Sequence, residues 1–330
     1  RRLCTEESSS RSSFKTTEMV HFKTAFNGYS VEFSPFEETK LAVATAQHFG
    51  IVGNGRQYVL DVRPQGIQVL CQFDSKDGLY DCSWSEQNEN HLISASGDGS
   101  VKLWDMARGS FPIASFEEHN HEVYSVDWNL QSKDTFISGS WDDTIKLWSP
   151  TRPRSIQTFQ EHKYCVYSAI WSPNSPVLFA SASGDYTVKI WDTKSPKSVQ
   201  TIAAHQYEIL SCDWNKYNEY QIATGSVDKT IRIWDIRSPS QPQRVLQGHT
   251  YAVRRVKFSP HSPNILASCS YDMSLCVWDI SSPNPLLQRY DQHSEFVVGL
   301  DFNIFVEGQI ASCSWDEMVY VWMQGTDPRS

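Results

Sequence analysis

The feature that most constrains the fold of this chain is a repeated spacing. Five times a histidine is followed 29 residues later by a tryptophan, and the unit recurs every 43 or 44 residues, with an aspartate six residues before each tryptophan. A sixth unit keeps Asp98 and Trp104 but has Ser75 at the histidine position. Self-similarity at such a period indicates an array of supersecondary units. The five complete sets are His119, Asp142 and Trp148; His162, Asp185 and Trp191; His205, Asp228 and Trp234; His249, Asp272 and Trp278; and His293, Asp316 and Trp322.

Each unit reads as four short strands. Residues 123–128 (VYSVDW), 136–140 (FISGS), 144–148 (TIKLW) and 155–159 (SIQTF) have strand composition and are separated by turn residues. Four strands per unit, with Trp-Asp ending most units, are typical of a WD40 propeller blade. An aromatic residue closes the first strand seven times, so we predict an all-β, seven-bladed WD40 β-propeller. These residues are Phe33, Trp84, Trp128, Trp171, Trp214, Phe258 and Phe302.

The two ends of the chain are expected to share one blade. Counted from Phe33, the first three strands occur seven times but the fourth only six times. Residues 20–24 (VHFKT) can supply the missing outer strand, which would close the ring and remove an open sheet edge. We therefore assign residues 19–330 to the propeller. Residues 1–18 are dominated by Ser, Thr and charge and are expected to be a disordered tail. Because Met19 directly precedes the closing strand, it stays open whether that tail is native.

The His, Asp and Trp sets predict a structural role. An aspartate in the turn between the second and third strands can orient the imidazole. Ser or Thr two and four residues before it, such as Ser181 and Ser183 before Asp185, points to the same face. Such groups can satisfy one another's hydrogen bonds in the interior. One constellation repeated around a ring argues against a unique active site, so we expect no catalytic residues and no enzyme.

Composition excludes several other classes. The chain has 29 basic and 38 acidic side chains, and a formal charge of −9 argues against general nucleic-acid binding. None of the eight cysteines forms a CxxC pair, so no zinc site is expected, and their scatter suits a reducing compartment. No apolar run approaches the roughly 18 residues that span a bilayer. These features predict a protein of the cytosol without a direct membrane span.

The first unit is atypical. Its second and third strands are joined by residues 50–57 (GIVGNGRQ), whose glycines suggest a bent or bulged connection, and Leu60 stands at the tryptophan position. Gly53, Asn54 and Gly55 lack the lysine and the Ser or Thr of a phosphate-binding loop. We therefore expect no nucleotide and no other cofactor.

Several stretches resemble one family in particular. They are FNGYSVEFSPF (residues 26–36), LAVATAQHFGIVGNG (41–55), EILSCDWNKYNE (208–219), GHTYAVRRVKFSPH (248–261) and ASCSYDMSLCVWD (267–279). These segments are similar to those of the peroxin-7 family, cytosolic receptors for the type 2 peroxisomal targeting signal. The similarity runs from about residue 19 to 330 and looks greatest to the plant versions.

The resemblance implies a function. Receptors of this family bind matrix proteins that carry an N-terminal nonapeptide of the form Arg-Leu, five variable residues, His or Gln, and Leu. They deliver this cargo with a co-receptor, which in plants resembles the type 1 signal receptor, to the peroxisomal docking machinery. The implied location is the cytoplasm, with cycling to the peroxisome matrix or membrane.

A receptor for such a peptide needs carboxylates for the arginine and an aromatic floor for the apolar stripe of the peptide helix. In a propeller, the start of each inner strand and the residue before each turn aspartate lie at one rim. These positions give the candidate peptide-binding residues Asp77, Glu122, Glu208 and Glu295, with the aromatics Trp141, Tyr164, Tyr207, Tyr251, Tyr271, Phe296 and Trp315. We expect the groove to be biased toward the aromatic side of the ring.

Two further points stay open in the sequence. Trp234 to Arg237 fit the short WDxR pattern with which some propellers dock to the adaptor of a cullin-RING ubiquitin ligase, so a substrate receptor of such a ligase is the alternative function. Arg254 and Arg255 are consecutive in an inner strand, so strict alternation predicts that at most one of them faces the central channel.

Overall fold

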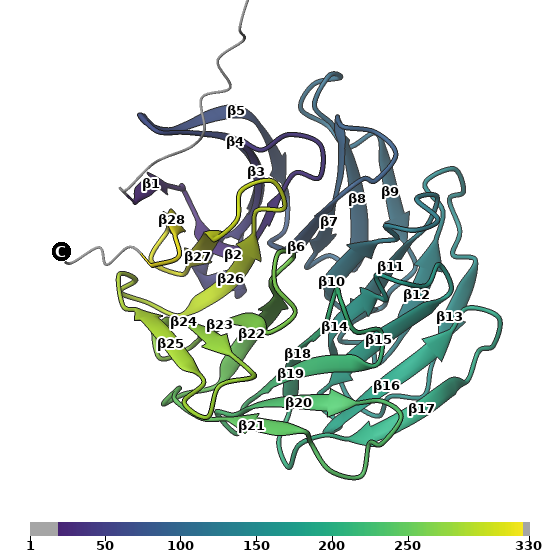
Figure 1. The fold of residues 1–330 in the computed structure, drawn as a ribbon. Helices are drawn as coiled ribbons and strands as arrows, with labels where there is room; N and C mark the ends of the chain where they lie inside the picture. Colours follow the sequence, from purple (N-terminus) through teal and green to yellow (C-terminus); the bar gives the residue numbers. More distant parts are fainter. Residues whose placement is uncertain (1–18, 326–330) are drawn as a thin grey trace, which may run out of the picture.

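The computed structural model of the protein describes residues 19–325. The strands of this part form seven four-stranded antiparallel sheets arranged as a ring, which confirms the all-β, seven-bladed WD40 propeller. Figure 1 shows the colours following the sequence around the ring. The tail expected at residues 1–18 lies outside the described residues, as do residues 326–330.

The first four blades follow the chain in order. Blade 1 comprises β2 (Asn27–Phe33), β3 (Lys40–Ala46), β4 (Gly55–Arg63) and β5 (Gly66–Ser75), and blade 2 comprises β6 (Leu79–Trp84), β7 (His91–Ser96), β8 (Ser100–Asp105) and β9 (Ala114–Glu117). Blade 3 comprises β10 (Val123–Trp128), β11 (Phe136–Ser140), β12 (Ile145–Trp148) and β13 (Gln157–Phe159), and blade 4 comprises β14 (Val166–Trp171), β15 (Leu178–Ser183), β16 (Thr187–Asp192) and β17 (Ser198–Ala203).

The remaining blades complete the ring. Blade 5 comprises β18 (Ile209–Trp214), β19 (Gln221–Ser226), β20 (Ile231–Asp235) and β21 (Arg244–Leu246), and blade 6 comprises β22 (Val253–Phe258), β23 (Ile265–Ser270), β24 (Leu275–Asp279) and β25 (Leu286–Tyr290). Blade 7 comprises β26 (Val297–Phe302), β27 (Gln309–Ser314), β28 (Met318–Met323) and the N-terminal β1 (Val20–Lys23). Its outer strand thus comes from the other end of the sequence.

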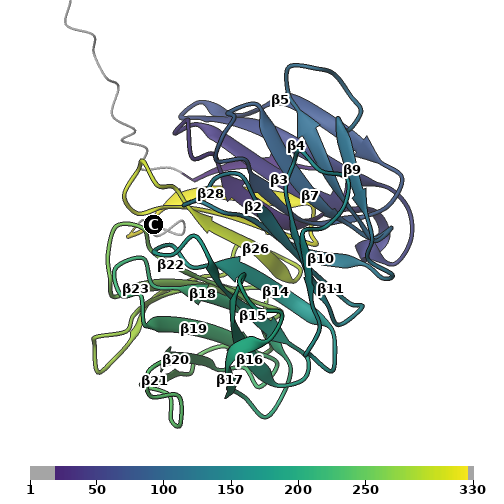
Figure 2. The same cartoon turned by 90° about the vertical axis from the view of Figure 1, so that its right-hand side faces the viewer.

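Strand β1 closes the ring as predicted. It pairs antiparallel with β28, with Val20 opposite Val321 and Lys23 opposite Met318. Figures 1 and 2 both place the yellow C-terminal strands beside the purple N-terminal ones. Phe22 packs on the core between blades 7 and 1, where its ring lies 5.9 Å from that of Tyr58. The closing strand therefore adds hydrophobic contact as well as backbone pairing.

The His, Asp and Trp sets form hydrogen-bonded chains inside the blades. In each of the five, the histidine Nδ1 lies 2.7–3.0 Å from the aspartate and Nε2 lies 2.6–2.7 Å from the Ser or Thr four residues before that aspartate. Four of the tryptophans donate from Nε1 to the same hydroxyl, at 2.8–3.1 Å, whereas Trp322 Nε1 has no partner in the described residues. The histidines are all buried. The arrangement suits a neutral imidazole that donates to the aspartate and accepts from the hydroxyl.

Blade 5 illustrates the electrostatics of these sets. Burial pushes the pKa of Asp228 up, but hydrogen bonds from His205 and Thr230 outweigh it and lower this pKa to about 2. Burial lowers the pKa of His205 in spite of the hydrogen bond to Asp228. Both directions favour an ionised aspartate beside a neutral histidine.

Every inner strand carries a β-bulge near its start. The register shifts at Gly28 to Ser30 in β2 and at Val253 to Arg255 in β22, and corresponding shifts occur in the other five inner strands. A bulge places two consecutive residues opposite one partner residue and interrupts the alternation of faces. Two neighbouring side chains per inner strand can therefore line the channel.

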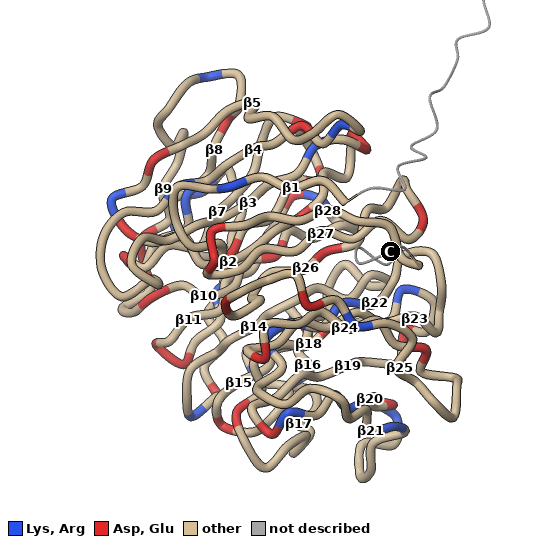
Figure 3. Tube along the Cα trace, turned by 90° about the vertical axis from the view of Figure 1, so that its left-hand side faces the viewer, with Lys and Arg blue, Asp and Glu red and all other residues tan. Residues whose placement is uncertain are grey.

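The described strands and the single four-residue 3₁₀ turn of residues 19–325 include no helix long and apolar enough to cross a membrane. Figure 3 shows acidic and basic residues interspersed along the chain rather than gathered into one basic surface.

Candidate functional site

One repeated backbone hydrogen bond builds the rim at one end of the ring. The residue before each turn aspartate donates to the segment that leads into the inner strand, as from Trp141 N to Glu122 O at 3.0 Å and from Trp315 N to Phe296 O at 3.1 Å. Val227 N donates to Glu208 O in the same way, at 3.0 Å. The acids and aromatics predicted for peptide binding are therefore held at the same end of the propeller.

Nine aromatic side chains form a continuous band around the channel mouth, which we call the aromatic collar. Neighbouring rings in it have centroids 4.7–6.3 Å apart, the separations at which aromatic pairs attract each other. The collar passes through every blade except blade 5. Its members are Tyr271, Phe296, Trp315, Phe49, Tyr29, Tyr80, Tyr124, Trp141 and Tyr167.

Four of the aromatic residues chosen from the sequence lie in the collar: Trp141, Tyr271, Phe296 and Trp315. The other three are more exposed. Tyr164 lies against Gly184, Tyr251 has Lys229 5.8 Å above its ring, and Tyr207 is 57 % exposed. The structure thus separates the sequence candidates into a packed group and an outlying group.

Sequence reasoning missed five members of the collar. Four of them, Tyr29, Tyr80, Tyr124 and Tyr167, occupy the bulge position of the inner strands of blades 1 to 4. They follow one another at 51, 44 and 43 residues, the same spacings as the aromatic residues that close those strands, so the repeat register could have revealed them. Blades 5 to 7 have Leu210, Arg254 and Val298 at this position, which is why the tyrosines stop there.

The fifth missed residue, Phe49, directly precedes the atypical link of blade 1. Ahead of this link, residues Gln47–Gly50 bend the chain in a 3₁₀ turn in which His48, Phe49 and Gly50 all have positive φ, of 50°, 56° and 71°. Tyr29 Oη donates to Phe49 O at 2.6 Å and Tyr80 Oη donates to Gly50 O at 2.7 Å. A Cβ on Gly50 would lie 2.5 Å from Tyr29 Oη, so glycine is required there.

Carboxylates stand around the collar. Glu122 and Glu208 are half-buried, and Glu295 is exposed at the entrance to β26. Burial raises the pKa of Tyr80, and the charges of Asp77 and Glu122 raise it further. Burial raises the pKa of Tyr167 in the same way, with Glu208 as the next cause.

Burial raises the pKa of Tyr271, on the opposite side of blade 5 from Tyr167, and Tyr124 raises it further, with Glu208 as a smaller cause. These shifts show that the acidic side chains lie close enough to act on the aromatic surface. The rim therefore offers an apolar floor together with negative charge, which suits a cationic amphipathic ligand.

Below the collar the channel is lined by charged and small polar groups. Arg255 Nη2 lies 3.0 Å from Asp81 Oδ1, and Lys257 Nζ lies 3.7 Å from Asp301 Oδ1. The prediction that at most one of Arg254 and Arg255 faces the channel is wrong, because both line the same cavity. The cause is the bulge in β22, which suspends the strict alternation on which the prediction relied.

Aspartates of the inner strands join neighbouring blades. Asp127 Oδ2 accepts from Trp171 N of the next blade at 2.6 Å, and Asp213 Oδ2 accepts from Phe258 N at 2.6 Å. Burial raises the pKa of Asp127 to about 7, with that backbone hydrogen bond opposing the shift. These acids hold the ring together and lie beneath the rim.

The structure gives little support to a metal site or to docking through the WDxR segment. No group of three or more His, Cys, Asp or Glu side chains in residues 19–325 is arranged to hold a metal ion. Arg237 of the WDxR segment is exposed and engaged within its own blade, since its Nη2 lies 2.7 Å from Asp235 Oδ2 and its guanidinium 4.3 Å from the ring centre of Tyr220.

Comparison with known proteins agrees with the fold. The WD domain, G-beta repeat model matches residues 67–105, 110–149 and 284–323, and the EIPR1 beta-propeller model matches residues 152–278. These segments fall in blades that the structure describes.

Curated relatives carry a more specific name. A protein of Dictyostelium discoideum named peroxisomal targeting signal 2 receptor is 63 % identical over 107 residues, which is 32 % of this chain and 34 % of the relative. Peroxisome biogenesis protein 7 of Arabidopsis thaliana is 56 % identical over 109 residues, again 32 % and 34 %. The Homo sapiens peroxisomal targeting signal 2 receptor is 50 % identical over 97 residues, 29 % of this chain and 30 % of the relative.

Each aligned stretch spans about a third of the relative that it matches. The expected preference for plant versions stays a prediction. The chain is a WD40-repeat β-propeller, and its curated homologues are named peroxisomal targeting signal 2 receptor.

Proposed function

We propose that this protein is a cytosolic import receptor that binds the type 2 targeting nonapeptide of peroxisomal matrix proteins. The observation that carries the proposal is the aromatic collar with Glu122 and Glu208 beside it. The nonapeptide has one arginine near its start and apolar residues on one helical stripe, so it needs such a pairing of charge and apolar surface.

The acids and the collar divide the binding task. A carboxylate such as that of Glu122 or Glu208 takes the cargo arginine through charge-assisted hydrogen bonds. Trp315, Tyr271 and Phe296 form a packed apolar surface for the leucines of the peptide. Because the collar is interrupted at blade 5, we place the peptide over the aromatic side of the ring, with Glu208 at its edge.

A co-receptor completes the binding site for the peptide. One face of a peptide helix lies on the rim, so a second protein is needed to cover the opposite face and exclude water from it. The receptor then delivers cargo and co-receptor to the peroxisomal docking machinery and cycles between cytosol and peroxisome. The names of the homologues support this role. A binding protein rather than an enzyme also fits the repeated hydrogen-bonded sets within the blades.

The test is a fluorescence-anisotropy titration of a labelled nonapeptide segment with the purified protein, with and without the binding region of the co-receptor. The control peptide has its arginine changed to glutamate. Saturable binding that requires the arginine is the expected result. Absence of binding under both conditions contradicts the proposal.

The ubiquitin-ligase alternative makes a different prediction. A ligase substrate receptor docks to its adaptor through the blade edge around Arg237, so the adaptor would co-purify with the wild type and be lost on Arg237→Ala. Under the import-receptor proposal the adaptor does not co-purify, and Arg237→Ala leaves peptide binding unchanged. The internal pairing of Arg237 with Asp235 favours this second result.

A further inference from the structure

Arg254 is a buried cation for which residues 19–325 supply no carboxylate partner. Strand β22 sends three cations into the channel, and two of them face acids: Arg255 faces Asp81 and Lys257 faces Asp301. Arg254 is only 2 % exposed, yet no acid in the described residues forms an ion pair with it. A buried charge is costly unless it is paired and hydrogen-bonded, so Arg254 retains a donor for a further acceptor.

The guanidinium of Arg254 is held by a hydrogen bond from Nη1 and by an aromatic ring, whereas Nη2 has no acceptor in the described residues. Nη1 donates to Leu210 O at 3.3 Å, and the guanidinium carbon lies 5.0 Å from the centre of the Tyr124 ring. None of residues 19–325 accepts a hydrogen bond from Nη2. The planar group is therefore held against the collar with one donor edge unoccupied by protein, an arrangement that suits a planar acceptor.

Most acids of the channel are engaged elsewhere, whereas Glu32 Oε2 has no hydrogen-bond partner in residues 19–325. Asp81 accepts from Val126 N and pairs with Arg255, and Asp127 accepts from Trp171 N. Asp213 and Asp301 likewise accept from backbone N–H groups of the next blade. Glu32 comes from a different strand, β2, and the cation whose charge acts most on it is Lys257.

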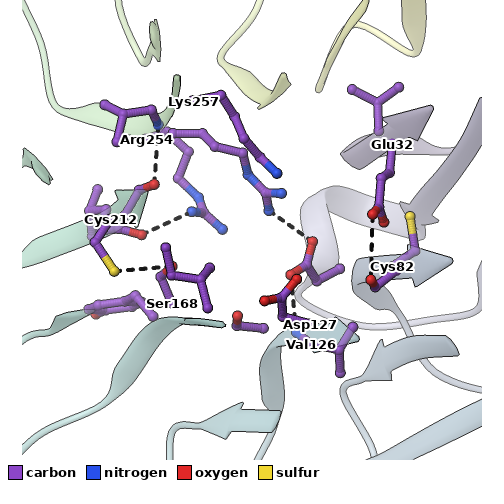
Figure 4. A pocket seen from close by; sticks show the side chains of 18 residues that line it. Glu32, Cys82, Val126, Asp127, Ser168, Cys212, Arg254 and Lys257 are labelled. Carbon is purple, nitrogen blue, oxygen red and sulfur yellow. Dashed lines mark hydrogen bonds and ion pairs between the residues drawn. The ribbon is translucent and has the colours of Figure 1, made fainter. Parts of the chain in front are cut away.

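The space beside Arg254 is small. Figure 4 shows Arg254 and Lys257 reaching from one strand into a cavity that Asp127 and Glu32 approach from other strands. The cavity measures about 40 Å³ and is also lined by Tyr167 and Leu210 of the collar level. A volume of this order holds a group the size of a carboxylate or a water molecule, which excludes a nucleotide or any large cofactor.

We propose that Arg254 is the anchor of a carboxylate-binding site at the mouth of the channel, filled by an acidic side chain of the protein that occupies the rim. The carboxylate enters between the tyrosines of the collar and accepts from the free Nη2 edge of Arg254. This identification of the occupant rests on the proposed function, whereas the affinity of Arg254 for a carboxylate does not.

The position of Arg254 inside the channel limits which acidic side chains of a bound partner can reach it. An acid on the partner must point into the channel axis to reach Arg254, while Glu122 and Glu208 at the rim repel it. An acidic residue therefore strengthens binding only at one place on the partner and only in one orientation. The site thus contributes to partner specificity as well as to affinity.

The first arm of the test uses formate as the probe, because formate is the smallest carboxylate. Formate replaces chloride at constant ionic strength, and the side-chain Nε–Hε resonance of Arg254 is followed in protein with ¹⁵N-labelled arginine. A saturable shift of this resonance is expected, with a rise of about 2 °C in Tm at ten times Kd. Arg254→Met should lose both effects, while the exposed control Arg237→Met should retain them.

If Arg254→Met does not fold, the wild-type resonance and an Arg254→Lys variant with weaker formate binding still test the site. No shift in the wild type, or an equal rise in Tm for Arg254→Met, overturns the carboxylate site.

The second arm identifies the source of the carboxylate. In the anisotropy assay, Arg254→Met should weaken binding of the nonapeptide and co-receptor by at least about tenfold, and formate should compete with them in the wild type. Formate binding without any effect on the partners overturns the role of a partner side chain and leaves a free carboxylate as the occupant. If no partner binds the wild type, the proposed function fails, and the first arm alone decides whether Arg254 binds carboxylates.

Discussion

Gln57 of blade 1 takes the place of the histidine that blade 2 lacks. Its Oε1 accepts a hydrogen bond from Ser94 Oγ at 2.8 Å, and Ser94 Oγ in turn accepts from Trp104 Nε1 at 2.9 Å. In blades 3 to 7 this hydroxyl bonds to a histidine of the connection that precedes the inner strand. Blade 2 has Ser75 at the histidine position, and Gln57 of blade 1 supplies the hydrogen bond that the histidine would make. The fully buried amide of Gln57 thus couples blades 1 and 2.

The first prediction concerns this contact. Gln57→Leu should lower the free energy of unfolding by about 1–3 kcal/mol, because the Ser94 hydroxyl loses its acceptor in the interior. Urea denaturation followed by tryptophan fluorescence measures the change. The control is Gln68→Leu, at an exposed position of β5, which should leave stability within error. A Gln57→Leu protein as stable as the wild type would show that the hydrogen bond is unimportant.

The second prediction concerns charge at the rim. Glu122→Lys and Glu208→Lys should each weaken nonapeptide binding at least tenfold and together abolish it, because both then repel the cargo arginine. Anisotropy titration of variants with wild-type Tm checks this. The matched control is Glu307→Lys, an exposed acid in the loop between β26 and β27 at the opposite end of the ring. Unchanged binding by the double variant would refute the placement of the peptide.

The third prediction distinguishes the collar from the outlying aromatics. Trp315→Ala should weaken peptide binding by about 2 kcal/mol, since Trp315 contacts Tyr29, Phe49, Tyr271 and Phe296. Tyr207→Ala, at an exposed residue on blade 5, should have the smaller effect. Equal losses for both variants in the same titration would mean that the peptide crosses blade 5 instead.

The fourth prediction is a pH dependence from Asp127, whose pKa burial raises from the ordinary 3.8 to about 7. The folded state holds this proton more tightly than the unfolded state, so its stabilising effect is complete below pH 3.8 and is lost as the pH rises through 7. Asp127→Asn removes the titration and keeps an oxygen for Trp171 N. The variant should therefore lose less stability between pH 5 and 8 than the wild type, by at most about 1.4 kcal/mol per pH unit.

Tm measured across this pH range checks the difference in slope. Asp134→Asn, at an exposed position, serves as the control and should follow the wild type. Parallel curves for the wild type and Asp127→Asn would count against a raised pKa.

The fifth prediction concerns ring closure. Removal of the residues up to Lys23 should lower the denaturation midpoint and cause association, because it exposes the edge of β28 and the apolar contacts of Phe22. Phe22→Ala should have a milder effect and His21→Ala, on the exposed side of β1, the least. Size-exclusion chromatography and denaturation compare the three. A truncated protein that stays monomeric and equally stable would show that β1 is dispensable.

The repeat spacing predicted most of the architecture, because a fixed register of His, Asp and Trp leaves few ways to arrange the strands. The same register placed Trp141, Tyr271 and Trp315 at one rim. It also contained the tyrosines of the inner strands, but their role depends on a bulge that the pattern of apolar residues does not reveal.

Contacts between blades were harder to anticipate. The partnership of Gln57 with Ser94 joins residues 37 positions apart in different repeats, and nothing in the local sequence of either residue indicates it. That no acid of the described residues pairs with Arg254 is a property of the whole channel, since it depends on how the acids of several strands are placed. Such features arise from the assembled ring and so cannot be read from one unit.

The pairing of β1 with β28 has a consequence for biosynthesis. β1 leaves the ribosome before every other strand of the propeller, yet its hydrogen-bonding partner is made last, almost 300 residues later. Until then β1 has no partner strand, and the six intervening blades can stack only as an open arc. The ring can therefore close only after the first and the last strand of the propeller have both been synthesised.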